Sequence, residues 1–151
     1  DLPMTTISRS TLVPYSAEEI YDLVNDVERY PEFIPWCKDT AILATSEETT
    51  RARMTFAKGG VEKSFVTANR HQHGKMIDIR LVEGPFQRLE GYWRFYDLGE
   101  GASKVTLDME FEFSNRVVAY AFGKVFTQVA NLLVDSFSQR ARQIYGERDV
   151  L

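Results

Sequence analysis

Residues 105–126 read VTLDMEFEFSNRVVAYAFGKVF, and the spacing of the apolar residues changes in the middle of this stretch. Up to Phe113 every second residue is apolar, which is typical of a strand with one buried face. From Val118 onward the apolar residues recur three and four positions apart, which is typical of an amphipathic helix. Ser114 or Asn115 can cap that helix. The sequence therefore predicts a strand that leads directly into one long C-terminal helix.

The same alternation extends back to Thr40 and predicts a sheet with one apolar and one wet face. Antiparallel sheets permit this division, whereas parallel sheets rarely do. Glycine-containing turns separate the segments, so we expect about six strands between Thr40 and Phe113. The apolar parity comprises Ala52, Met54, Phe56, Ile77, Ile79, Leu81, Leu89, Trp93, Phe95, Val105, Leu107, Met109, Phe111 and Phe113.

Upstream of this sheet the chain predicts one further strand and two short helices. Ile7–Val13 alternates and contains the Thr and Val that strands favour. Ser16 and Glu19 form a capping-box pattern, because the Ser16 hydroxyl can accept from the Glu19 amide while the Glu19 side chain reaches back. Pro31 lacks a backbone N–H and must punctuate the second helix. We expect this bent helical pair to end near Trp36.

These elements predict an α+β fold in which a curved antiparallel sheet wraps around the long C-terminal helix. A curved sheet and a straight helix cannot touch along their whole lengths, so we expect a gap roofed by the two short helices. That gap is the candidate ligand cavity. The chain shows no internal repeat, linker or low-complexity tract, so residues 4–146 are predicted to form a single domain. Residues 1–3 precede Met4 and are interpreted as a remnant of cloning.

The composition limits the kinds of partner that this protein can have. A formal net charge of −4 argues against a protein whose whole surface binds nucleic acid or anionic lipid, and we expect no DNA partner, although a local basic patch remains compatible with this charge. The one cysteine, Cys37, excludes an intramolecular disulfide, and we expect a cytoplasmic protein. We expect no apolar run that approaches the roughly 18 residues of a membrane span. We therefore expect no stable membrane insertion and leave peripheral membrane contact open.

Two unusual glycine and arginine positions allow both a structural and a functional interpretation. Gly91 falls on the apolar parity between Leu89 and Trp93, where it either makes room for a ligand or lets the sheet bend. Arg140 falls on the apolar stripe of the long helix, where it either extends outward to solvent or contacts a polar ligand head. The sequence leaves both choices open.

The sequence contains few residues in patterns that would indicate catalysis or a metal site. His71 and His73 would share one strand face, but no third ligand is near them in the sequence, so we predict no metal site. Cys37 has no motif around it and is interpreted as a structural thiol. No phosphate loop or nucleophile elbow occurs, so we predict no catalytic residue, no catalytic cofactor and no enzyme activity.

Three stretches closely resemble one protein family across nearly the whole chain. The first runs from Val13-Pro14-Tyr15-Ser16 through residues 21–37, which read YDLVNDVERYPEFIPWC. The second is Gly84-Pro85-Phe86 with Leu89 and Trp93, and the third runs through FEFSN at 111–115 to AFGKVF at 121–126. This pattern is similar to the coenzyme Q-binding branch of the START-like, polyketide-cyclase-like superfamily. The resemblance implies the helix-grip fold, in agreement with the order of elements derived above.

The resemblance implies, first, a non-catalytic protein that binds ubiquinone and acts as a carrier or chaperone supporting cellular respiration. On this hypothesis the polyprenyl tail lies between helix and sheet, and the quinone head lies near the mouth of the cavity. Large apolar groups can also fill a core, so a core role for the same residues stays open. Arg140 is the candidate for contact with the ligand head. The candidate lining residues are Phe33, Trp36, Phe86, Leu89, Trp93, Met109, Phe122, Phe126 and Val129.

The resemblance also implies an alternative, because a bacterial toxin of this branch binds the large ribosomal subunit and blocks its joining to the small one. This function needs a basic surface, and basic residues are frequent in the segment from residue 51 to residue 75. The same residues can equally form an ordinary solvated sheet face. The candidate ribosome-facing residues are Arg51, Arg53, Lys58, Lys63 and Arg70, with Lys75 beside them. A small-molecule cyclase or hydrolase is a third hypothesis, which would require a pKa-shifted carboxylate or histidine in the cavity.

Overall fold

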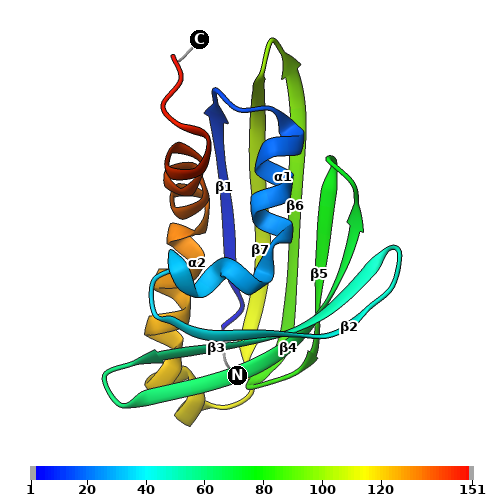
Figure 1. Cartoon of the computed structure of the whole chain (residues 1–151). Coiled ribbons are helices and arrows are strands. Elements are labelled where there is room, and N and C mark those ends of the chain that lie inside the picture. The colour runs from blue at the N-terminus through cyan, green and yellow to red at the C-terminus, as the bar shows by residue number, and fades with distance from the viewer. Residues whose placement is uncertain (1–2, 150–151) are drawn as a thin grey trace.

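The computed structural model describes residues 3–149, and these residues form one seven-stranded antiparallel sheet with a long helix against it (Figure 1). The strands follow the order β1-β7-β6-β5-β4-β3-β2, so β2 to β7 form a continuous meander and β1 is added beside β7. This is the helix-grip fold that the family resemblance implies. The strands are β1 (Thr5–Val13), β2 (Cys37–Thr45), β3 (Thr49–Lys58), β4 (Val61–Gln72), β5 (Met76–Glu83), β6 (Phe86–Gly99) and β7 (Ala102–Phe113).

The period of two along the strands places their apolar residues on the inner face of the sheet. In β7, Val105, Leu107 and Phe111 are almost fully buried, whereas Asp108 between them is exposed. Figure 1 shows that β2, β3 and β4 cross the direction of β1, β6 and β7, so the sheet curls strongly. The expected first strand, six later strands and one-sided burial are confirmed.

The two short helices, α1 (Ala17–Asn25) and η1 (Val27–Glu32), connect β1 to β2. The predicted capping box is present, because Ser16 accepts from the Glu19 amide at 3.1 Å and Glu19 accepts from the Ser16 amide at 2.9 Å. The second element differs from the expectation: it is a 3₁₀ helix that ends at Glu32, before Trp36. Pro31 lies inside it and donates no backbone hydrogen bond, which favours a short helix at this point.

The C-terminal helix, α2 (Arg116–Tyr145), begins at an Asn115 cap whose side chain accepts from the Val118 amide at 2.9 Å. It ends at Gly146, which has a φ of 85°. Gly123 lets the helix approach the sheet closely, since a Cβ there would lie 3.2 Å from the Phe113 ring.

The length and composition of α2 also match those of a membrane-spanning helix, so the expectation that no such stretch exists is wrong. The core helix of a globular protein has the same properties, and α2 packs one face against the sheet. One hydrophobic core draws residues from β1 to α2. Of the proposed cloning remnant, Asp1 and Leu2 lie outside the described residues.

Candidate functional site

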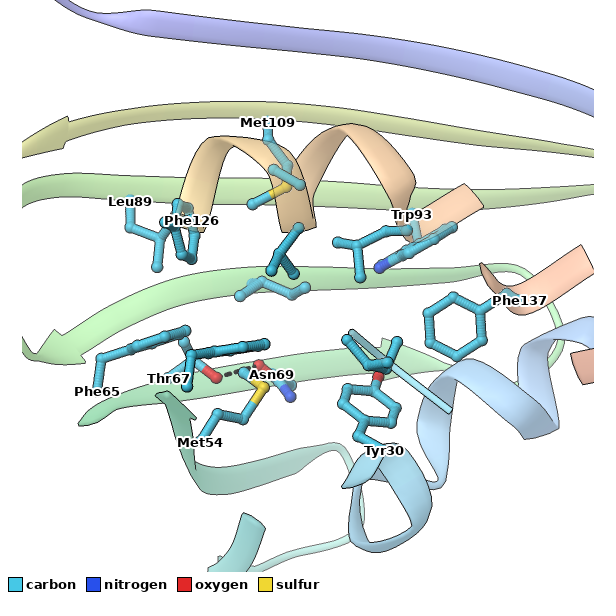
Figure 2. Close-up of a pocket in the computed structure, with 16 residues that line it drawn as sticks. Tyr30, Met54, Phe65, Thr67, Asn69, Leu89, Trp93, Met109, Phe126 and Phe137 are labelled. Atoms are coloured by element: carbon cyan, nitrogen blue, oxygen red, sulfur yellow. Dashed lines mark hydrogen bonds between the residues drawn. The ribbon is translucent and has the colours of Figure 1, made fainter. Parts of the chain in front are cut away.

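A cavity of ≈ 60 Å³ lies between α2, η1 and the inner faces of β3 to β7 (Figure 2). Its walls are almost entirely apolar. Pockets that hold drug-sized ligands usually measure about 300–1,000 Å³, so this cavity is small in the structure. Its lining residues are Tyr30, Ile34, Met54, Phe56, Phe65, Thr67, Asn69, Ile79, Leu89, Trp93, Met109, Phe126, Val129, Ala130, Leu133 and Phe137.

Five of the predicted lining residues contribute to the cavity wall: Leu89, Trp93, Met109, Phe126 and Val129. They come from β6, β7 and α2, the elements whose periodicity is clearest in the sequence. The predicted gap between helix and sheet is therefore present, and these residues surround it. Figure 2 shows Trp93 and Met109 from the sheet opposite Tyr30 and Met54.

Four other predicted lining residues lie outside the cavity wall. Phe86 and Phe122 belong to an aromatic cluster at one end of the cavity, where the ring centroids of Phe86 and Phe126 are 4.9 Å apart. In the structure these two residues are part of the hydrophobic core. Phe33 packs against Phe137 at 5.2 Å, and Trp36 lies beneath the ammonium of Lys58 at 4.0 Å. Both are half-buried in the η1–β2 connection and pack against the hydrophobic core.

A hydrogen-bonded polar pair interrupts the apolar wall. Thr67 and Asn69 lie two positions apart on β4, so both point inward, and the Thr67 hydroxyl donates to Asn69 Oδ1 at 2.8 Å. Both residues are buried, and within residues 3–149 the Asn69 amide nitrogen has no hydrogen-bond partner of its own. The cavity thus offers a hydrogen-bond donor to an acceptor oxygen.

The sequence interpretation missed this pair because it assigned no inward parity to β4. The signal was present as the alternation Phe65, Thr67, Asn69, in which Thr and Asn occupy positions that apolar residues take on the other strands. Polar residues on an inward parity are informative, since burying them without a partner costs free energy.

The only titratable side chain that lines the cavity, within the part of the chain that the structure describes, is that of Tyr30. Its hydroxyl donates to the Val24 carbonyl, and burial raises the pKa of this phenol, which therefore stays protonated. No carboxylate or histidine of the described residues lies in the wall. The requirement that the cyclase or hydrolase hypothesis set is thus not met here.

Arg140 does not reach the cavity and forms an outer brace over η1. Its guanidinium donates to Glu32 Oε1 at 2.6 Å and lies 4.9 Å from the Phe33 ring centroid. This hydrogen bond from Arg140 lowers the pKa of the Glu32 carboxyl. The side chain thus neither extends freely to solvent nor meets the cavity; it fastens α2 to η1.

Gly91 is covered from inside by its neighbours. A Cβ there would meet Met109 at 3.4 Å and Ile79 at 3.6 Å, which is ordinary van der Waals contact. Gly91 itself does not line the cavity. The missing side chain therefore leaves little additional room for a ligand.

The histidines and the cysteine are engaged in separate local contacts. His73 lies 3.1 Å from Glu18, and His71 lies 3.4 Å from the Thr50 hydroxyl. Cys37 is buried, and this burial raises the pKa of its thiol to about 11. Across residues 3–149, no group of three or more His, Cys, Asp or Glu side chains is placed to hold a metal ion.

Three of the predicted basic residues share one patch on the outer face of the sheet. Arg51 and Arg53 point outward from β3, and Arg70 points outward from β4, because Thr49, on the parity of Arg51, pairs with Arg70. All three are exposed, and none forms an ion pair with another described residue. We call Arg51, Arg53 and Arg70 the arginine face.

The remaining predicted basic residues lie elsewhere. Lys63 pairs with Phe56 in the β3–β4 ladder and therefore has inward parity, as does Lys58 near the end of the same hairpin. Lys75 lies in the β4–β5 turn at the opposite end of β4. The expected cluster is thus divided among three places.

The comparisons with known proteins agree with this architecture. The helix-grip fold and its apolar cavity are typical of the START-like class of proteins. The chain belongs to the polyketide cyclase / dehydrase and lipid transport family, whose model matches residues 13–138. The Zhui aromatase/cyclase from Streptomyces sp. R1128 has the same fold, with a TM-score of 0.80 at 14% identity over 97% of this chain and 100% of that one. A START superfamily protein from Mycobacterium smegmatis gives 0.76 at 24% identity, covering 92% and 98%.

Relatives in sequence are considerably more similar. The ribosome association toxin RatA of Pseudomonas aeruginosa is 49% identical over 142 residues, which is 94% of this chain and 99% of that protein. RatA of Escherichia coli K12 is 40% identical, covering 98% and 94%. The mitochondrial coenzyme Q-binding protein COQ10 homolog B of Xenopus laevis is 29% identical, covering 95% of this chain and 60% of its own length.

Proposed function

We propose that this protein associates with the ribosome, binds its large subunit through the arginine face and hinders subunit joining. The observation that carries the proposal is the exposed arginine face without ion-pair partners, on a chain 40–49% identical to proteins named ribosome association toxin RatA. This was the alternative hypothesis from the sequence, and the relatives favour it over the quinone carrier. Such a role is cytoplasmic and needs no catalytic residue.

The chemistry of the arginine face suits ribosomal RNA. Each guanidinium can form two parallel hydrogen bonds to a phosphate, and it remains charged at every physiological pH. Neutralising a phosphate releases condensed counterions, which supplies affinity without reading sequence. A patch of three cations provides this locally even though the whole chain carries −4.

Sedimentation with isolated large subunits at constant Mg²⁺ tests the proposal. We expect wild-type protein to pellet with the subunits, and the R51A/R53A/R70A variant to bind at least about ten-fold more weakly. The matched control is R80A/R88A, which removes two arginines from the same sheet face where each is already paired with a carboxylate. Triple-variant binding equal to that of wild type would reject the arginine face, and a lack of binding by wild type would reject the whole proposal.

A second candidate function is binding of a polyprenyl quinone in the cavity, which the apolar wall and the Asn69 donor favour. Burying an isoprenoid tail supplies about 25 cal/mol per Å² of apolar area, and a quinone carbonyl oxygen can accept from Asn69. A cavity of ≈ 60 Å³ must widen to admit such a ligand. The quinone would carry any redox chemistry itself.

Mass spectrometry of lipid co-purified with the protein tests this function without presuming the ligand. Quenching of the tryptophan fluorescence of a Trp36→Phe variant, in which Trp93 is the remaining tryptophan, by added ubiquinone gives the affinity. Asn69→Leu in the same background removes the donor. A solvent extract free of quinone, together with no saturable quenching, would exclude the quinone carrier.

A further inference from the structure

The amino-terminal half of α2 carries the most exposed large apolar side chains of the described residues. Val117 is 77% exposed and Tyr120 is 92% exposed, whereas Phe122 and Phe126 on the opposite side of the same turns are buried. With Ala121, which is also exposed, they lie on adjacent turns of one helix face. We call Val117, Tyr120 and Ala121 the apolar tip of α2. Packing does not require these residues, because they face away from the core.

The apolar tip is flanked by positive charge. Arg116 and Lys124 are exposed on the same turns, and neither forms an ion pair with another residue between 3 and 149. The sequence contains no Asp or Glu from residue 113 to residue 134. The β3–β4 hairpin adds Lys58, whose ammonium lies 3.5 Å from Gln128 on the next turns of the helix.

The position of the apolar tip places it close to the cavity along the same helix. Phe126, Val129 and Ala130 line the cavity and follow Tyr120 by only two to three turns. In Figure 1 the start of α2 and the β3–β4 hairpin lie at the same end of the molecule. A surface that receives this end would therefore lie beside the cavity.

We propose that the apolar tip of α2, with Arg116 and Lys124 beside it, docks on an anionic lipid surface. A helix with apolar and aromatic residues between cations lies in the membrane interface, where tyrosine is favoured. The helix cannot cross the bilayer in this fold, because its opposite face is part of the core. Exposed Val and Tyr side chains gain little from RNA phosphates, so this surface differs in chemistry from the arginine face.

Co-sedimentation with vesicles tests the docking surface. We expect binding to phosphatidylglycerol-containing vesicles and at least about ten-fold weaker binding to phosphatidylcholine vesicles, since each cation near an anionic surface contributes about five-fold in affinity. V117S/Y120S and R116E/K124E should each reduce binding to the anionic vesicles at least about ten-fold. The matched control is L12S/L98S, which replaces two apolar residues that are 66% and 52% exposed elsewhere on the molecule. Circular dichroism verifies that every variant is folded.

The outcomes separate this proposal from the ribosomal one. Equal binding of wild type and V117S/Y120S, or no binding to anionic vesicles, would overturn the docking surface. If V117S/Y120S instead loses large-subunit binding while vesicle binding is unchanged, the apolar tip belongs to the ribosomal interface and lipid docking is rejected. R51A/R53A/R70A should bind vesicles like wild type, so a failure of the ribosomal proposal leaves this result unaffected.

Discussion

The two halves of the sheet differ in both of their faces. In the half formed by β1, β6 and β7, most of the inner face packs against α2, although Leu89, Trp93 and Met109 line the cavity. The outer face of this half carries Arg88 paired with Glu90 at 3.1 Å and with Glu110 at 3.3 Å. In the half centred on β3 and β4, the inner face borders the cavity, and the outer face carries the arginine face without ion-pair partners among the described residues. We call these the packed half and the binding half.

Strand register explains the difference between the outer faces. Arg80 pairs with Glu90 across β5 and β6, and Arg88 pairs with Glu112 across β6 and β7. Arg51, in contrast, lies between Ala44 and Ala68, and Arg53 lies between Ala41 and Val66. An arginine opposite a glutamate is therefore neutralised, whereas an arginine opposite alanine or valine stays available to bind a phosphate. Charge in a sheet has to be judged across the strands rather than along them.

Arg70 marks the boundary between the two halves. It pairs with Asp78 across β4 and β5, but the Asp78 carboxylate accepts from Arg80 Nε at 2.9 Å. Arg80 also contacts Glu90 at 2.7 Å. The carboxylate nearest to Arg70 in the ladder is thus engaged by the network of the packed half, which leaves Arg70 to the arginine face.

The largest expected effect tests the dense interior of the packed half. Phe122→Ala should lower the free energy of unfolding by about 3–5 kcal/mol, because Phe122 is fully buried among Phe86, Phe113 and Phe126. Met54→Ala, at the cavity wall of the binding half, should cost less, since Met54 is only partly buried. Urea unfolding measures both, and equal losses would contradict the division into two halves.

The next effect is the salt dependence that three unpaired arginines predict. The logarithm of the large-subunit affinity should fall with the logarithm of salt with a slope of about −2.1 to −2.7, which corresponds to roughly 20- to 40-fold between 50 and 200 mM. Removing one arginine of the arginine face should reduce the slope by about one. R80A should leave the slope unchanged, and a flat salt profile for wild type would refute phosphate contact.

A smaller effect is expected from giving one arginine of the binding half a carboxylate partner, as the arginines of the packed half already have. Ala68→Glu places a carboxylate between Arg51 and Arg80 while every arginine is kept, because Ala68 pairs with Arg51 on one side and with Arg80 on the other. Arg80 is already paired with Asp78 and Glu90, so the new carboxylate is expected to pair with Arg51. We expect about five-fold weaker subunit binding, since one cation is withdrawn from the phosphates. Ala68→Gln has a similar size without the charge and should bind like wild type. Similar loss from both substitutions would indicate a steric cause.

The smallest effect concerns the ion pair between Arg148 and Glu19, which holds the residues that follow α2 to α1. The hydrogen bonds from Arg148 at 2.7 and 2.9 Å lower the pKa of Glu19 below its ordinary value of 4.5. A carboxyl whose pKa is depressed in the folded state stabilises the fold above the ordinary pKa and loses that contribution as pH falls through the lowered one. The Tm difference between wild type and Arg148→Ala should therefore be constant at pH 6–7 and shrink below pH 4.5. A difference that stays constant down to pH 3 would argue against this ion pair.

The fold could be predicted from the sequence to a greater extent than the site. Two periodicities and a capping box are local properties, and they determine the strands, α1 and α2. The lining residues on β6, β7 and α2 followed from the same periodicities. Phe86 and Phe122 could not be separated from Leu89 by parity alone, because packing at the end of the cavity decides whether an inward ring borders empty space or other rings. The inward position of Asn69 could have been predicted from the alternation of residues along β4.

The arginine face was only partly predictable, for a different reason. A run of basic residues along the sequence does not reveal which of them share a face, and the hairpin geometry moved Lys58 and Lys63 to the inward parity. Whether a carboxylate stands opposite each arginine depends on the register of strands that are distant in sequence. The cross-strand neighbours of each arginine can therefore be identified only in the folded sheet.

The pairing of β1 with β7 has a consequence for how this protein is made. Thr5 pairs with Phe111 and Val13 pairs with Ser103, so the first strand has to wait for roughly a hundred further residues before its partner exists. The strands from β2 to β6 can form hairpins as they leave the ribosome, because each pairs with its neighbour in sequence. At about 5–20 residues per second, β1 spends about 5–20 seconds as an unpaired strand beside the ribosome on which it was made. The sheet closes, and the helix packs against it, only after β7 and α2 have been made.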